Sequence, residues 1–86
     1  MEIELSPRAL NDLAKWRKSG NKKIQKKITE LTSSILQAPF DGIGKPEPLK
    51  HDMTGLWSRR ITKEDRYIYE VQGELIIVHS LKGHYE

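Results

Sequence analysis

Glu47 stands between two prolines, in a stretch of the sequence that is rich in glycine and proline. Pro46 and Pro48 restrict the backbone around it to extended conformations. A carboxylate on such a stiff support is suited to act as a general base, because proton transfer requires a fixed position. Glu47 is therefore a candidate catalytic residue, and an incidental glutamate in a surface turn is the alternative.

Other residues complete a set that could cleave RNA. Arg66 and Arg59 carry guanidinium groups, which bind phosphate bidentately and stabilise charge that develops on it. His84 carries an imidazole, which is partly protonated near neutral pH and can protonate a leaving oxygen. With Glu47 as the base for a ribose 2′-hydroxyl, these residues predict metal-free cleavage of RNA by its own 2′-oxygen. Tyr85 could stack on an unpaired base or donate a hydrogen bond.

Several other classes of site are absent from the sequence. There are no cysteines, which excludes disulfides, thiol nucleophiles and thiolate metal sites. The histidines have no metal-ligand spacing and no glycine-rich nucleotide loop occurs, so we expect neither a metal nor a cofactor. The longest apolar run, Leu75 to Val78, is far too short to span a membrane, and the first residues lack the features of a secretion signal. We therefore expect a cytoplasmic protein without a membrane partner.

Positive charge is concentrated in one region of the chain. The formal net charge is +3, and five of the eight Lys and Arg residues in positions 1–44 lie between Lys18 and Lys27. Crowded cations are unfavourable in the first half of a helix, where the macrodipole favours acidic residues. This pattern points to an acidic partner such as RNA, with a solvated helix face as the alternative. The candidate residues for this contact are Lys22, Lys23, Lys26 and Lys27.

Hydrophobic periodicity indicates the elements that must position these residues. Residues 2–5 alternate as a short strand, and Ser6 with Pro7 marks the start of a helix that ends near Gly20. Apolar residues at 24, 28, 31 and 35 form one stripe of a second helix, which ends before Pro39. A loop over residues 39–48 follows and carries Glu47.

The second half of the sequence alternates with a period of two. Residues 56–62, 66–71 and 75–80 read as strands joined by short turns, which is typical of an antiparallel meander. The sequence therefore predicts a single α+β domain over residues 1–86. In it, two N-terminal helices pack on one face of an antiparallel sheet of about four to five strands.

Several segments of the sequence indicate a protein family more specifically than any single catalytic residue does. They are Gly44-Lys45-Pro46-Glu47-Pro48-Leu49-Lys50-His51, Gly55-Leu56-Trp57-Ser58-Arg59-Arg60-Ile61-Thr62, Asp65-Arg66-Tyr67-Ile68-Tyr69 and His84-Tyr85. In this order and spacing the chain closely resembles the Txe/YoeB toxins of the RelE superfamily, over nearly its whole length. The resemblance implies a RelE-like fold.

The resemblance also implies an activity and partners. Members of that family are bacterial endoribonucleases that bind the ribosomal A site, cut the messenger RNA there and stop translation. A YefM-like antitoxin neutralises them, and the sequence leaves open whether the free toxin is a monomer or a homodimer. Carried over residue by residue, the catalytic set is Glu47, Arg66, His84 and Tyr85, while Lys50 and Arg59 match basic positions near the scissile phosphate. The lysine-rich second helix would then face ribosomal RNA.

The sequence departs from the family pattern at its last residue, and two alternatives to a nuclease function stay open. The family usually ends at the His-Tyr pair, whereas this sequence continues to Glu86, which adds negative charge beside the proposed acid. One alternative is a non-catalytic module that binds RNA or the ribosome through the same basic residues. Another is an inert protein that holds its partner and whose catalytic group is spoiled by Glu86.

Overall fold

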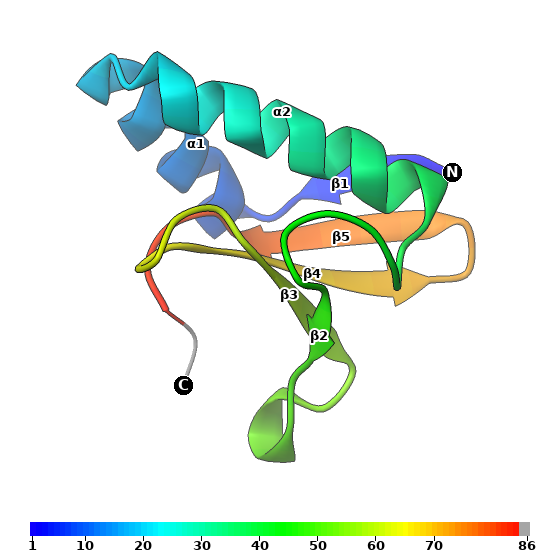
Figure 1. Cartoon of the computed structure of the whole chain (residues 1–86). Coiled ribbons are helices and arrows are strands. Elements are labelled where there is room, and N and C mark those ends of the chain that lie inside the picture. The colour runs from blue at the N-terminus through cyan, green and yellow to red at the C-terminus, as the bar shows by residue number, and fades with distance from the viewer. Residues whose placement is uncertain (85–86) are drawn as a thin grey trace.

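The computed structural model describes residues 1–84. Tyr85, which was predicted as a catalytic residue, and Glu86, which follows it, lie outside the described residues. The chain begins with β1 (Glu2–Leu5), α1 (Pro7–Ser19) and α2 (Lys22–Gln37), in that order (Figure 1). The second half contains β2 (Glu47–Pro48), a one-turn 3₁₀ helix (His51–Met53), β3 (Leu56–Arg60), β4 (Arg66–Gln72) and β5 (Leu75–Ser80). Among the described residues, no helix is both long and apolar enough to cross a bilayer.

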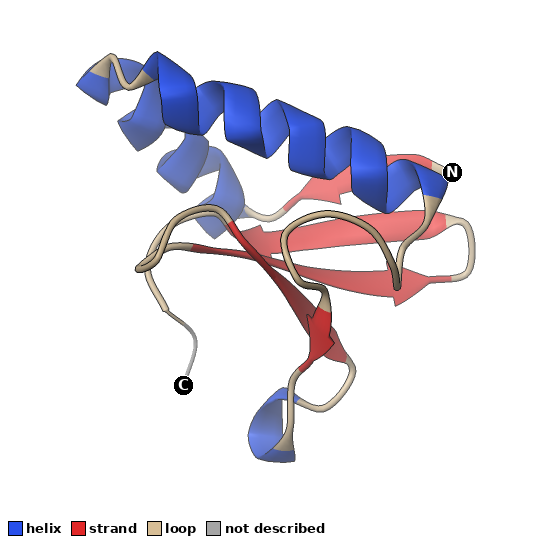
Figure 2. Ribbon diagram, viewed as in Figure 1, coloured by secondary structure: helices blue, strands red, loops and turns tan. Residues whose placement is uncertain are grey.

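The strands form one sheet with the order β1-β5-β4-β3-β2. Figure 2 shows both α-helices on the same side of this sheet, which confirms the predicted α+β arrangement. The sheet is mixed rather than wholly antiparallel, because β1 pairs with β5 in parallel. Alternation of Ile3 and Leu5 defines which side of a strand is buried but is the same for both directions, so the sequence pattern did not reveal this difference.

Local signals account for the helix boundaries. The Ser6 hydroxyl accepts a hydrogen bond from the Ala9 amide at 3.1 Å and caps α1, as predicted. At the other end, Gly20 adopts the left-handed conformation with φ 73°, which a residue without a side chain adopts at little cost. The Asn21 side chain then accepts a hydrogen bond from the Ile24 amide at 3.1 Å and starts α2.

The core lies between the helices and the sheet. Ile28, Leu31 and Ile35 of α2 are buried and belong to the same cluster as Tyr67 and Tyr69 of β4. This stripe is the one that the sequence pattern predicted for the second helix. Burying it against the sheet fixes which side of β4 faces the helices.

The strand register then defines what lies on the opposite, helix-free side of the sheet. Glu47 pairs with Ser58, and Ser58 pairs with Ile68, so these residues form a row across β2, β3 and β4. Ile68 alternates with the core residues Tyr67 and Tyr69, which places this row on the side away from α1 and α2. The helices therefore cover one side of the sheet, and the row of Glu47, Ser58 and Ile68 lies on the uncovered side, where a ligand could bind.

Candidate active site

An open pocket of about 330 Å³ lies on the helix-free side of the sheet. Four residues of the predicted set line it, from three separate stretches of the chain: Glu47, Lys50, Arg66 and His84. The lining is completed by Pro48, Leu49, Ser58 and Ile68. Ser58 was not among the predicted residues, because its place opposite Glu47 follows from a strand pairing that the sequence did not indicate.

Glu47 is held by the pairing of its short strand with β3. Backbone hydrogen bonds flank it, from the Arg60 amide to the Gly44 carbonyl at 2.7 Å and from the Leu49 amide to the Leu56 carbonyl at 2.9 Å. Residue 47 was expected in a loop, and the structure instead places it in the two-residue strand β2. Its side chain is exposed on this fixed backbone and is therefore accessible to a ligand.

Arg66 is partly used by the protein and partly available. Its Nη1 donates to the carbonyls of Thr62 at 2.9 Å and Lys63 at 3.0 Å, in the turn between β3 and β4. Within residues 1–84, its Nε and Nη2 make no hydrogen bond. These two atoms share one edge of the guanidinium, and such an edge can bind two phosphate oxygens at once.

His84 follows β5 on a short segment that returns to the start of β4. The Arg66 amide donates to the Gly83 carbonyl at 3.0 Å, so the residue before His84 is bonded to the backbone of Arg66. The His84 side chain is exposed and lines the pocket. The backbone thus brings an imidazole and a guanidinium to the same place.

The charges in the pocket favour an anionic ligand. Lys50 and Arg66 are cationic and His84 can be protonated, whereas Glu47 is the single acidic residue among the lining residues. The site therefore combines a carboxylate that can accept a proton, cations of the kind that bind phosphate and an imidazole that can donate a proton. Among residues 1–84, no group of three or more His, Cys, Asp and Glu side chains could hold a metal ion.

Arg59 does not belong to this pocket, and the expectation that it binds phosphate is wrong. The residue is fully buried, with 0% of its surface exposed, on the helix side of the sheet. Its guanidinium donates to the hydroxyls of Tyr69 and Ser34 and to three backbone carbonyls. All its donor positions are thus used inside the protein, and none remains for RNA. The three carbonyls belong to Ala38, Asp41 and Ile43.

The predicted basic residues of the second helix surround a separate cleft. Lys23, Lys26 and Lys27 line a cavity of about 610 Å³ together with Ile61 and Thr62 of the turn between β3 and β4. Lys22 is exposed beside it in the first turn of α2. Thr62 also accepts the hydrogen bond from Arg66, so the same turn contributes to the basic cleft and supports the pocket.

Similarity to known proteins identifies the class to which this fold and pocket belong. The family model described as the YoeB-like toxin of bacterial type II toxin–antitoxin systems matches residues 5–85. The toxin YoeB of Escherichia coli K12 is 41% identical over 85 residues, which cover 99% of this chain and 100% of that protein.

Solved structures agree with this class. A YoeB dimer from Staphylococcus aureus superposes with a TM-score of 0.89 and 43% identity, covering 99% of this chain and 98% of that one. A YoeB–YefM complex from the same species gives a TM-score of 0.87 and 45% identity, covering 96% of this chain and 95% of that one. These findings define the protein as a toxin of a bacterial type II toxin–antitoxin system. More particularly, the chain belongs to the YoeB-like toxin family, as its sequence motifs indicated.

Proposed function

We propose that this toxin is an endoribonuclease that cleaves messenger RNA in the ribosomal A site and thereby stops translation. The observation that carries the proposal is the convergence of Glu47, Arg66 and His84 on one pocket of net positive character. These three residues have the chemical types that cleavage of RNA by its own 2′-hydroxyl requires. The reaction needs no metal and no cofactor.

Each residue has a distinct role in the proposed reaction. The Glu47 carboxylate removes the proton of the 2′-hydroxyl, and the 2′-oxygen attacks the adjacent phosphorus. Arg66, through Nε and Nη2, binds the non-bridging oxygens as negative charge increases on them, and Lys50 adds a second cation. His84 protonates the departing 5′-oxygen as its bond to phosphorus breaks. The products are a 2′,3′-cyclic phosphate and a 5′-hydroxyl, and Tyr85 is proposed as a fourth participant that stacks on a base or donates a hydrogen bond.

The site on the ribosome is proposed to involve the basic cleft. Lys22, Lys23, Lys26 and Lys27 lie on exposed or half-exposed positions of α2, and cations in such an arrangement attract the phosphates of ribosomal RNA. Residues 1–86 would act as a single toxin domain in the cytoplasm, where ribosomes translate.

The relatives suggest partners for this chain. The Staphylococcus aureus YoeB structure in complex with YefM supports a YefM-like antitoxin, which would neutralise the toxin. The YoeB dimer from that species supports a homodimer as a second assembly of this chain.

The proposal is tested by mapping cuts on messenger RNA in purified ribosomal complexes. We expect cleavage in the A site with a 5′-hydroxyl on the downstream fragment, at the same rate when the toxin has been dialysed against EDTA before it is added to the ribosomal complexes. The Arg66→Ala variant should cleave roughly 100- to 1,000-fold more slowly, which is the usual effect of losing one group that stabilises developing charge. Its binding to ribosomes should change little, because this contribution belongs to the transition state.

Arg60→Ala is the matched control, because Arg60 pairs with Arg66 in the sheet but does not line the pocket. It removes the same charge and should leave the cleavage rate within about threefold of the parent. If Glu47→Gln, Arg66→Ala and His84→Ala all inhibit translation as strongly as the parent, the protein is a non-catalytic ribosome-binding module. Loss of cleavage after the toxin alone has been dialysed against EDTA would contradict the metal-free mechanism.

A further inference from the structure

The segment that carries His84 is held by side chains that come from distant parts of the chain. Residues 81–83 connect β5 to His84, and within residues 1–84 the His84 side chain makes no hydrogen bond of its own. An exposed imidazole without such a bond takes its position from the backbone that precedes it. The contacts of residues 81–83 therefore decide where His84 lies.

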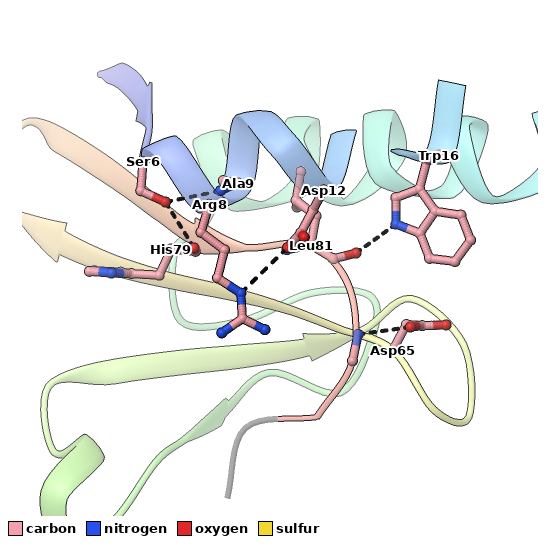
Figure 3. A network of polar contacts seen from close by, with 9 residues as sticks. Ser6, Arg8, Ala9, Asp12, Trp16, Asp65, His79 and Leu81 are labelled. Carbon is pink, nitrogen blue, oxygen red and sulfur yellow. Dashed lines mark hydrogen bonds and ion pairs between the residues drawn. The ribbon is translucent and has the colours of Figure 1, made fainter. Parts of the chain in front are cut away.

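Two side chains of α1 hold Leu81 from both ends of the residue (Figure 3). The Asp12 carboxylate accepts a hydrogen bond from the Leu81 amide at 3.0 Å. The Trp16 indole donates to the Leu81 carbonyl at 2.8 Å. Asp12 and Trp16 are one helical turn apart, and both are buried. Together they fix the backbone at the point where the chain leaves the sheet.

A third side chain holds the residue next to His84. The Asp65 carboxylate accepts a hydrogen bond from the Gly83 amide at 2.8 Å through one oxygen. Its other oxygen accepts from the Thr62 hydroxyl at 2.8 Å. Asp65 thus links the His84 segment to the turn whose carbonyls bind Arg66.

The burial of Asp12 indicates that its hydrogen bond to Leu81 has a role beyond packing. Asp12 is 4% exposed, and its hydrogen bond to Leu81 joins positions that are 69 residues apart. Arg8 lies within 3.8 Å of the carboxylate but is itself more than half exposed. A buried carboxylate is costly, and an apolar residue of similar size would pack against the sheet with less desolvation. Its particular contribution is the position of the segment.

We propose that Asp12, Trp16 and Asp65 are positioning residues that hold His84 at the correct distance from Arg66 and the scissile phosphate. None of them lines the pocket, so they act through the backbone of residues 81–83 rather than on the substrate. This inference rests on the proposed nuclease function and deepens it. A displacement of about 1 Å of a catalytic group is enough to slow a reaction by roughly 100-fold.

The test compares variants that each remove one of the hydrogen bonds to Leu81. Trp16→Phe keeps an aromatic ring and removes the indole N–H, while Asp12→Ala removes the acceptor of the Leu81 amide. Both should lower kcat between roughly tenfold and 100-fold on ribosomal complexes, with KM close to that of the parent. Asp12→Asn retains a side-chain oxygen that can accept from Leu81, so it should restore most of the rate.

Tyr67→Phe is the matched control for loss of stability. It also removes one hydrogen bond, between the hydroxyls of Tyr67 and Thr32 at 2.8 Å, but on the far side of the sheet from the pocket. Its kcat should equal that of the parent. If Tyr67→Phe slows cleavage as much as Trp16→Phe does, the proposed positioning role is wrong.

A double-mutant cycle adds a readout that a merely structural role would not change. In the His84→Ala background, Trp16→Phe and Asp12→Ala should cause no further loss of rate, because their effect passes through His84. A loss by the same factor as in the parent background would overturn the proposal.

A measurement without RNA separates this inference from the proposed function. In Asp12→Ala, amide hydrogen exchange at Leu81 and Gly83 should become faster, and the NMR signal of the His84 imidazole should shift, whereas Tyr67→Phe should change neither. If the parent does not cleave RNA, the proposed function fails, yet these signals still decide the positioning of His84. Unchanged exchange and an unchanged imidazole signal in Asp12→Ala would overturn it.

Discussion

Arg59 illustrates how a charged residue can serve the fold instead of the substrate. Its hydrogen bonds to Ala38 and Asp41 end on carbonyls at and just beyond the end of α2. The helix macrodipole places partial negative charge at that end, so the guanidinium is a favourable cap although none of its hydrogen bonds, within residues 1–84, goes to a carboxylate. The same bonds hold the loop that leads to Glu47.

Removing the Arg59 guanidinium should destabilise the protein strongly. We expect Arg59→Met to lower the free energy of unfolding by roughly 3–5 kcal/mol, because five polar groups lose their buried partner at once. Urea denaturation measures this change. Arg60→Met is the matched control, since Arg60 is exposed on the other side of the same strand, and it should stay within about 0.5 kcal/mol of the parent. Equal stability of the two variants would contradict the structural role of Arg59.

A signal for this role was present in the sequence. Arg59 alternates with Trp57 and Ile61 along the predicted strand, which is the pattern of a side that faces the core. Residue type favoured phosphate binding, and residue position favoured burial. The prediction from position was the correct one, because alternation along a strand decides which side of the sheet a side chain faces, whatever its charge.

The loop between α2 and β2 approaches the core closely at Gly44. Gly44 has φ 81°, and a Cβ atom there would lie 2.6 Å from Leu31 of α2. Only glycine fits such a position without displacing the core. The contact between Gly44 and α2 therefore helps to fix the start of the strand that carries Glu47.

Strand β4 places two tyrosines in the core, and this makes stability dependent on alkaline pH. Burial raises the pKa of Tyr67 from 10.0 to about 12, and it also raises the pKa of Tyr69, where the hydrogen bond from Arg59 acts in the opposite direction. In the unfolded chain both hydroxyls ionise near their ordinary pKa of about 10. The folded state therefore binds the proton more tightly than the unfolded state does.

The free energy of unfolding should accordingly fall at high pH. The contribution of Tyr67 is complete below about pH 10 and is lost as pH rises through about 12, with a total of roughly 2–3 kcal/mol. Urea denaturation at a series of pH values measures it. Tyr67→Phe cannot ionise at this position, so its stability should decline less steeply than that of the parent. Parallel curves for the two proteins would contradict this prediction.

The sequence predicted well those helices and helix ends that depend on residues close by in the chain. The capping residues Ser6 and Gly20 and the stripe of α2 act within a few residues of where they stand. The direction of β1 was not predictable in this way, because its partner β5 lies at the other end of the chain. Pairing across such a distance depends on the whole packing arrangement.

At the scale of the whole molecule, the basic cleft and the pocket are connected by one turn. The turn between β3 and β4 provides Ile61 and Thr62 to the cleft, and its carbonyls bind Arg66. A change in the shape of this turn should therefore affect both the cleft and the position of Arg66.

The lysines of the cleft should govern the affinity for ribosomes rather than the chemistry. Replacing Lys23 and Lys27 by Gln should weaken binding to ribosomes and reduce the slope of log K against log salt by about 1.5, if each lysine contacts one phosphate. The cleavage rate at saturating ribosome concentration should remain that of the parent. Replacing Lys15 and Lys18 of α1 removes the same charge outside the cleft and serves as the control. Equal effects of both pairs would show that only net charge matters.

The candidate site was largely predictable, but its supporting residues were not. The convergence of Glu47, Arg66 and His84 on one pocket was predictable, because their types suit one reaction and their motifs are specific to a family. Asp12 and Trp16 lie in a helix whose pattern explains only its packing, and their bonds reach Leu81 across 69 and 65 residues. No local pattern encodes a contact over that distance.

The two outermost strands of the sheet have a further consequence. β1 is four residues long and carries Glu2 and Glu4, both exposed, while β2 is two residues long and ends at Pro48, which has no amide proton. Neither border therefore offers the long, uncharged row of amides and carbonyls on which another chain could add itself. At high concentration, copies of this toxin should therefore resist growth into fibrils.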